Sequence, residues 1–318
     1  MPRRIRRVLP LLLPAVLVLG LSGCGDDDGG GGSDSDPGAA LDTVQIAGEF
    51  GSAPEVTFDG EVEAGEVTTE VVSEGDGAKV AKGDRVLTHL WIGNGFTQQK
   101  SFSTYDAKKA EVLTVDEEQL SGVFVEGLEG QTIGSRVAVA ASAEEAFGPQ
   151  GNPQLQIGNK DSVVVILDLL STVADGPEGD AVPAPSWAPK LVEKGGTPTG
   201  FDFAGTPAPS SNLRSATLID GSGPVVEKGQ TIAVNYLGQV YQGKKPFDES
   251  YSAQPTAFGI GVGQVVPGWD KSLVGVKVGS RVLLSIPPED GYGKQGNESA
   301  GIKGTDTLYF VVDILAAA

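Results

Sequence analysis

Cysteine and histidine are almost absent: the 318 residues contain one of each, Cys24 and His89. A single cysteine cannot close an internal disulfide, so the folded parts of the chain depend on packing for stability. Serine–histidine catalysis would require a partner that orients His89, and the sequence offers none. Cysteine, histidine and acidic residues nowhere cluster with metal-ligand spacing, so we expect neither a metal nor a cofactor.

Basic residues are also scarce, with 23 Lys and Arg against 42 Asp and Glu and a formal charge of −19. A surface this acidic disfavours binding to nucleic acid. Four arginines stand within the first seven residues, directly before the apolar run VLPLLLPAVLVLG. This run is too short and too interrupted by proline to span a bilayer stably, and a basic start before such a run is typical of a secretory signal. We therefore predict a signal peptide at residues 1–23.

Residues 21–24 read LSGC. In this position they resemble the lipobox of bacterial lipoproteins, which implies that Cys24 carries lipid, palmitate included, and becomes the mature N-terminus. The alternative is an ordinary secretory signal with an incidental cysteine. Residues 24–42 are rich in glycine and aspartate and contain almost nothing that could be buried, which predicts a flexible tether. We expect the protein on the extracytoplasmic face of the cell membrane, held by its lipid anchor.

The rest of the chain repeats itself. LEGQTIGSR at 128–136 matches LVGVKVGSR at 273–281, and AFGPQGN at 146–152 matches GYGKQGN at 291–297. A period this long is the length of a domain, not of a solenoid repeat. The sequence therefore predicts two copies of one domain, at 43–173 and 190–318, joined by a linker rich in proline and glycine at 174–189. The leaders of the copies are expected to pack as peripheral strands.

Apolar patterning within each copy is typical of strands. RVLTHLWIG, TIAVNYLGQVY, SRVLLSIP and TLYFVVDIL are short, rich in β-branched or aromatic residues, and bounded by glycine, proline or aspartate. Residues 266–273 differ, because proline stands near a helix start and Trp269 and Leu273 are spaced by four. We expect an α+β fold in which an antiparallel β-sheet wraps on one short helix.

Five segments of the second copy appear together in one order: NYLG (235–238), FDES (247–250), FGIGVGQVVPGWD (258–270), VGSRVLLSIPPEDGYG (278–293) and TLYFVVDIL (307–315). They resemble the FKBP-type peptidyl-prolyl isomerases over roughly residues 216–315. The resemblance implies two tandem FKBP-like domains, with the second one catalytic. GIGVGQ is only superficially similar to a nucleotide-binding loop, because it lacks the spacing and the strand–helix context.

The resemblance also implies the site. Trp269 takes the place of the floor of an aromatic basin that accepts the proline ring, and Tyr292 that of the hydroxyl that reaches a substrate carbonyl. Val265 and Val266 match the pair whose backbone contacts the bound peptide. The other implied site residues are three aromatic walls, a pocket carboxylate and an apolar residue of the overhanging loop: Tyr236, Phe247, Phe310, Asp248 and Ile302.

Such a site can act without a nucleophile. Rotation about an X–Pro bond breaks amide resonance, against a barrier of roughly 18–20 kcal/mol. The planar amide is more polar than the twisted transition state, so an apolar pocket that removes water favours the twisted form. A few oriented donors then hold the flanking carbonyls.

The first copy lacks most of these side chains. At the positions of Tyr236, Asp248, Trp269, Tyr292 and Phe310 it carries Leu90, Ser103, Phe124, Phe147 and Val165. Phenylalanine keeps the ring of tyrosine but cannot donate a hydrogen bond, so we predict a weak or inactive isomerase at 43–173. In the second copy, the loop ESYSAQ after Asp248 lacks the arginine often found there, and Thr256 replaces a common aromatic. Macrolide inhibitors are therefore candidate ligands whose affinity the sequence leaves open.

The leading hypothesis is a lipid-anchored isomerase that acts on proline-containing unfolded or exported polypeptides and assists their folding. A non-catalytic chaperone or scaffold, which would use the same basins only to hold extended segments, is the alternative. A solute-binding lipoprotein would suit the anchor but not the repeated small domains.

Overall fold

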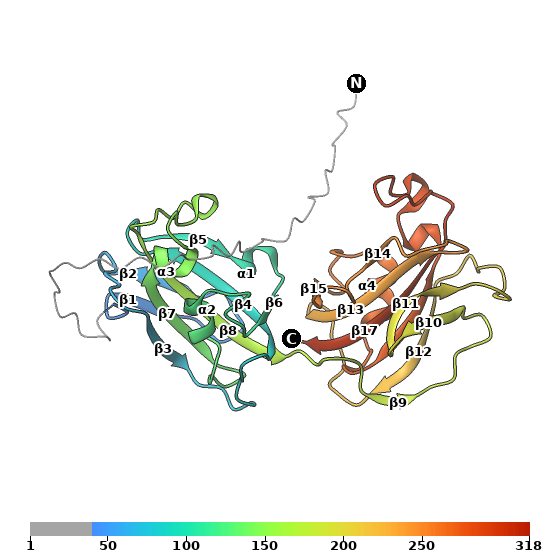
Figure 1. Cartoon of the computed structure of the whole chain (residues 1–318), viewed down its shortest axis with the longest axis horizontal. Coiled ribbons are helices and arrows are strands. Elements are labelled where there is room, and N and C mark those ends of the chain that lie inside the picture. Colours follow the sequence, from blue (N-terminus) through green and yellow to red (C-terminus); the bar gives the residue numbers. More distant parts are fainter. Residues whose placement is uncertain (1–39) are drawn as a thin grey trace, which may run out of the picture.

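The computed structural model describes residues 40–318. The predicted signal peptide, Cys24 and the tether as far as residue 39 lie outside the described residues. No helix in the part from residue 40 onward is long and apolar enough to cross a membrane. The described chain forms two domains side by side, the first coloured blue to green and the second yellow to red (Figure 1).

The first domain is built on one antiparallel sheet. Its strand order is β3 (Thr68–Ser73), β7 (Arg136–Ser142), β8 (Ser162–Thr172), β4 (Arg85–Asn94) and β5 (Gln99–Ser103), with β6 (Glu111–Thr114) also paired to β4. Because β4 and β8 pair along most of their length at the centre, they carry the most buried side chains of the domain.

The second domain repeats this order. Its sheet runs β12 (Arg214–Gly221), β16 (Arg281–Ile286), β17 (Leu308–Ala317), β13 (Thr231–Val240) and β14 (Asp248–Glu249), with β15 (Thr256–Gly259) on β13 and β9 (Gly179–Ala181) added beyond β12. Even the irregularity in register recurs: it falls between Leu87 and Thr88 in β4 and between Ala233 and Val234 in β13. The sequence repeat is therefore a repeat of fold.

One short helix occupies the same face of each sheet, α2 (Gly122–Glu126) in the first domain and α4 (Pro267–Leu273) in the second. The first domain also has the one-turn helices α1 (Thr104–Ala107) and α3 (Ala143–Phe147), and three 3-10 turns complete the helical segments: η1 (Pro153–Leu155), η2 (Pro288–Asp290) and η3 (Gly293–Gln295). Helix α3 begins with a capping box, in which the Ser142 hydroxyl and the Glu145 carboxylate each accept from the other's backbone N–H. The predicted α+β fold of antiparallel sheets and few short helices is confirmed.

The leader of each copy covers the face of the sheet opposite the helix. In the first domain this cover is the hairpin β1 (Val44–Ala47) and β2 (Glu55–Phe58), and in the second it is β10 (Lys190–Lys194) and β11 (Thr197–Asp202). Alternate residues of a strand point to opposite faces. Val165 and Leu167 thus join the helix-side core, while Val164 and Ile166 join the core beneath the hairpin. Each domain therefore has two apolar layers.

The structure moves two predicted boundaries. Ala40 and Leu41, expected in the tether, are buried against the first domain, so the packed chain begins before residue 43. The segment 174–189, expected to be a linker, contains β9, which pairs with β12. Glu178 N–H also donates to the Gly279 carbonyl at 2.9 Å. Most of this segment belongs to the second domain because the backbone groups of its strand find partners at the free edge of β12.

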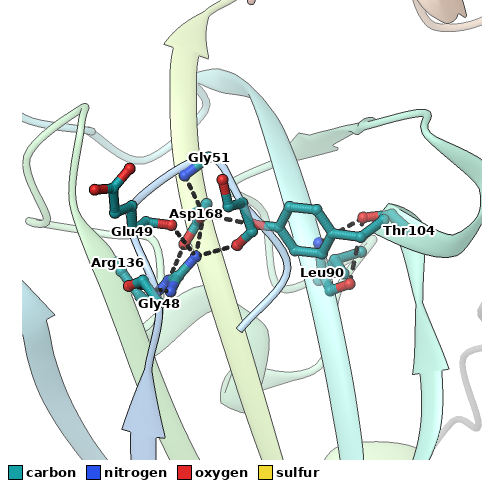
Figure 2. Close-up of polar contacts among 9 residues, drawn as sticks. Gly48, Glu49, Gly51, Leu90, Thr104, Arg136 and Asp168 are labelled. Carbon is teal, nitrogen blue, oxygen red and sulfur yellow. Dashed lines mark hydrogen bonds and ion pairs between the residues drawn. The ribbon is translucent and has the colours of Figure 1, made fainter. Parts of the chain in front are cut away.

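A buried ion pair fastens the leader to the sheet in both domains. Arg136 and Asp168 are 1% and 0% exposed, and Arg136 Nε donates to Asp168 Oδ1 at 2.6 Å. The same guanidinium donates to the carbonyls of Gly48 and Glu49, and Asp168 accepts from Gly51 N–H at 2.7 Å (Figure 2). The leader loop is thus held from both sides by charge-assisted hydrogen bonds.

The second domain has the equivalent pair, Arg281 Nε to Asp313 Oδ1 at 2.6 Å. Here the leader supplies a carboxylate, because Arg281 Nη1 donates to Glu193 Oε1 of β10 at 2.7 Å. A tyrosine hydroxyl donates to the aspartate in each domain, from Tyr105 in the first and from Tyr251 in the second.

The domains meet through a small apolar cluster of their own. It joins buried residues of β4, β13, β15 and β17 with two buried residues that adjoin β6 and β8: Leu87, Ala233, Ala257, Leu315, Ala316, Ala110 and Val173. Four of the seven are alanines, which allow the strands to approach closely. Figure 1 shows β6 and β15 next to each other across this contact.

Candidate active site

The structure brings all nine predicted site residues together. Eight belong to one apolar cluster on the helix side of the second sheet: Tyr236, Phe247, Val265, Val266, Trp269, Tyr292, Ile302 and Phe310. The ninth, Asp248, accepts a hydrogen bond from the Tyr236 hydroxyl at 2.7 Å. Strands β13, β14 and β17, helix α4 and three connecting segments supply these residues, so the site forms only when the domain folds.

Aromatic rings meet edge to face around Trp269. Its ring centroid lies 5.5 Å from Tyr236, 5.4 Å from Phe258 and 5.4 Å from Phe310, with interplanar angles of 83°, 75° and 86°. This arrangement places the positive edge of one ring against the negative face of another. Phe247 and Phe310 pair in the same way, with their centroids 5.6 Å apart. The cluster is therefore a network of rings in fixed orientations.

The indole is more covered than we expected. Trp269 is 3% exposed, so its neighbours conceal the predicted floor, and the accessible surface of the cluster belongs to the half-buried Tyr236, Phe247, Val265 and Val266. The physical reason is the close edge-to-face packing of rings described above. Two cavities, of about 640 and 520 Å³, lie elsewhere, one between the domains and one beside Phe201. The accessible part of the site is therefore formed by these half-buried side chains.

One buried donor in the cluster is unsatisfied. The indole Nε1 of Trp269 has no hydrogen-bond partner within residues 40–318. A buried N–H without an acceptor costs free energy, and most such groups in folded proteins are paired. This unpaired group belongs to the same apolar cluster as the predicted site residues.

Two tyrosine hydroxyls remain protonated beside the cluster. Burial raises the pKa of Tyr236 above its ordinary value, and the hydrogen bond to the Asp248 carboxylate raises it further. Burial also raises the pKa of Tyr292, opposed by a hydrogen bond with Asn297 and assisted by the charge of Asp248. Both hydroxyls are therefore neutral donors at physiological pH.

The loop before α4 is held by an aspartate that the sequence reading did not single out. Asp270 accepts from Gly261 N–H at 2.7 Å and from Gly263 N–H at 2.8 Å. The N–H groups of Val265 and Val266, further along the same loop, have no hydrogen-bond partner in the described chain. These two N–H groups are available to a bound polypeptide.

Two other residues of the site were missed. Phe258 packs against Tyr236 and Trp269, and Gly238 faces the ring pair. A Cβ at position 238 would lie 2.6 Å from ring atoms of both Phe247 and Phe310. Glycine is therefore required for the two rings to meet. The sequence contained a signal for it, since the first copy has Ile92 at the equivalent place.

The first domain is closed at the equivalent positions. Leu90, Ser103, Phe124 and Val165 are all less than 9% exposed. Phe124 and Phe147 still touch, with their centroids 6.3 Å apart, but neither ring carries a polar group. The equivalent site thus consists of core without donors at its surface.

Among residues 40–318, no group of three His, Cys, Asp or Glu side chains is placed to hold a metal ion. The fold and the site define a small α+β domain that presents aromatic rings, two neutral hydroxyls and free backbone N–H groups on one side of its sheet. Such a surface suits an apolar group flanked by carbonyls.

Comparisons with known proteins agree with this description. The family model of FKBP-type peptidyl-prolyl cis-trans isomerases matches residues 223–315, within the second domain. An FK506-binding protein of Streptomyces anulatus is 39% identical over 116 residues, which are 36% of this chain and 93% of that protein. FK506-binding protein 4 of Aspergillus oryzae is 34% identical over 134 residues, 40% of this chain but 28% of that protein.

Among solved structures, FkpA from Escherichia coli shares 37% identity, and the match covers 35% of this chain and 50% of that one with a TM-score of 0.31. The Streptomyces relative is covered almost completely, whereas this chain spans only about a quarter of the length of the fungal one. The chain belongs to the FKBP-type peptidyl-prolyl cis-trans isomerase family, and its enzymatic activity is that of this family.

Proposed function

We propose that the second domain carries the isomerase activity and that the first domain is weak or inactive. One observation carries this proposal: the side chains implied as the site gather in the second domain, with the Tyr236 and Tyr292 hydroxyls and the Asp248 carboxylate among them. The first domain has Leu90, Phe147 and Ser103 at these three positions and so lacks both phenols and the carboxylate. The substrates are proline-containing unfolded or exported polypeptides. FK506-type macrolides, which the names of the relatives mention, are candidate inhibitors.

The proposed mechanism follows from the contacts. The prolyl ring enters among the half-buried rings, which removes water from the X–Pro amide and favours its less polar, twisted form. The free N–H groups of Val265 and Val266 and the neutral Tyr292 hydroxyl bind the flanking carbonyls. Asp248 orients Tyr236 through their hydrogen bond.

A matched pair of substitutions in the full chain tests the assignment to a domain. Trp269→Ala should lower kcat/KM for a proline peptide at least about tenfold, because it removes the floor of the site, whereas Phe124→Ala at the equivalent position of the first domain should not. Both substitutions remove a buried ring, so each leaves a core cavity in its own domain. Asp248→Ala provides a second test of activity, and because Asp248 is exposed this substitution leaves no cavity in the core. Equal activity loss in the Trp269 and Phe124 variants would contradict the proposal.

The alternative is a chaperone or scaffold that holds extended segments without catalysis. The free loop N–H groups suit binding as well as catalysis. A wild-type chain that binds proline peptides but isomerises them no faster than buffer supports this alternative.

We also propose that lipid on Cys24 anchors the protein at the extracytoplasmic face of the membrane, where it assists the folding of exported proteins. The support is the basic, apolar and LSGC sequence of residues 1–24. Cys24→Ser should move the protein from the membrane to the soluble fraction. Unchanged retention of this variant would count against lipidation.

A further inference from the structure

The loop that precedes α4 is tied to the other domain. Gln264 stands directly before Val265, and its side-chain Nε2 donates to the Ala107 carbonyl of the first domain at 3.1 Å and approaches the Lys108 carbonyl at 3.5 Å. These carbonyls stand at the C-terminal end of α1, where backbone acceptors have no partner within the helix. A side chain of the second domain therefore caps a helix of the first.

The anchor on the first domain is rigid. Tyr105 in α1 donates its hydroxyl to the buried Asp168, which also binds Arg136. Thr104, at the start of the same helix, accepts from Leu90 N–H at 2.9 Å and donates to the Leu90 carbonyl, as Figure 2 shows. Helix α1 is thus fixed to the sheet through a network of which no member is fully exposed.

The loop on the second domain depends on such support. Gly261 and Gly263 have φ angles of +76° and +78°, and the loop that contains them lies outside every helix and strand of the domain. The carboxamide of Gln264 lies on Gly259 at the end of β15, where a Cβ would be 2.6 Å from its Oε1. The tie to Ala107 and the bonds to Asp270 therefore hold the loop at two points.

We propose that Gln264 is a positioning residue and that the first domain acts through it to fix the peptide-contacting backbone of Val265 and Val266. The first domain thereby contributes to isomerisation without a site of its own. This inference rests on the proposed function of the second domain. Because the loop would contact the peptide equally in the ground and transition states, loosening it should raise KM and leave kcat unchanged.

Peptide isomerisation kinetics on full-length variants test the proposal. Gln264→Ala should raise KM about three- to tenfold with kcat within about twofold of wild type, and Gln264→Glu should do the same or more because a carboxylate repels the two carbonyls. Gln254→Ala is the matched control. It removes contacts between the domains, with Thr114 at 3.0 Å and with Gln119, but lies outside the loop.

Hydrogen exchange measures the mobility of the loop independently of activity. Exchange at the Gly261 and Gly263 N–H groups, which donate to Asp270, should accelerate in both Gln264 variants and not in Gln254→Ala. Wild-type KM in the Gln264 variants, or an equal rise in Gln254→Ala, overturns the positioning role. If activity survives Trp269→Ala, the proposed site is wrong; if activity requires Trp269 but ignores Gln264, only this inference fails.

Discussion

The two buried ion pairs allow the same substitution, Asp to Asn, to be made at equivalent positions of the two domains and its effects to be compared. Asp168→Asn keeps the shape of the side chain but removes the charge opposite Arg136, which is 1% exposed. The guanidinium then keeps only carbonyl partners, from Gly48, Glu49 and Ser52. Breaking a buried pair from one side costs about 3–5 kcal/mol because the remaining charge is uncompensated.

Asp313→Asn should cost less. Arg281 retains the carboxylate of Glu193 at 2.7 Å, on a side chain that is 39% exposed and can move to the guanidinium. The loss is then limited to hydrogen bonds with a charged group, roughly 1.5–3 kcal/mol. The first domain should therefore be destabilised more than the second by the same chemical change.

Hydrogen exchange at increasing denaturant concentration, followed separately in peptides from β8 and β17, gives the free energy of unfolding of each domain. A double variant, Arg136→Met with Asp168→Leu, serves as the control, since it leaves no unpaired charge and should recover part of the loss. Equal losses in the two domains, or a greater loss for Asp313→Asn, would refute the role assigned to Glu193.

Two further outcomes are expected. Gly238→Ala should force Phe247 and Phe310 apart, destabilise the second domain by ~1–3 kcal/mol and lower isomerase activity. The control is Gly122→Ala, where a Cβ meets nothing within 4 Å, and it should change neither stability nor activity. Normal activity in Gly238→Ala would contradict the role of the contact between the two rings. The second domain should also lose stability in alkali more steeply than the first, because burial raises the pKa of Tyr236, Tyr251 and Tyr292 there but only of Tyr105 in the first domain. The stability that comes from these protonated tyrosines is complete below their ordinary pKa of 10.0 and falls as the pH rises above it. Parallel pH profiles of unfolding in the two domains would contradict this prediction.

The sequence pattern predicted most of the fold because the central strands have the composition that is typical of strands. The segments around β4, β13, β16 and β17 were expected from their β-branched and aromatic composition, and helix α4 from its proline and the spacing of Trp269 and Leu273. The pairing of β9 with β12 was missed because its sequence, GDA, has no strand propensity. Its pairing depends on an open neighbouring edge, which only the folded sheet creates.

The site was predictable where a side chain acts through its own chemistry. All nine residues from Tyr236 to Phe310 gather as expected. Gly238 acts by leaving room for two rings, and Asp270 and Gln264 act by hydrogen bonds with backbone groups. Neither role can be predicted from residue type alone. The covered state of Trp269 could not be predicted either, since it depends on the orientation of three neighbouring rings.

The matching irregularity of register in β4 and β13 has a practical consequence. Because β4 and β13 shift register at equivalent positions, the two sheets match strand for strand across the repeat. Each domain can therefore supply segments for chimeras with the other domain. Transplanting residues 258–270 onto the first domain would test whether this segment is enough to change the isomerase activity of that domain.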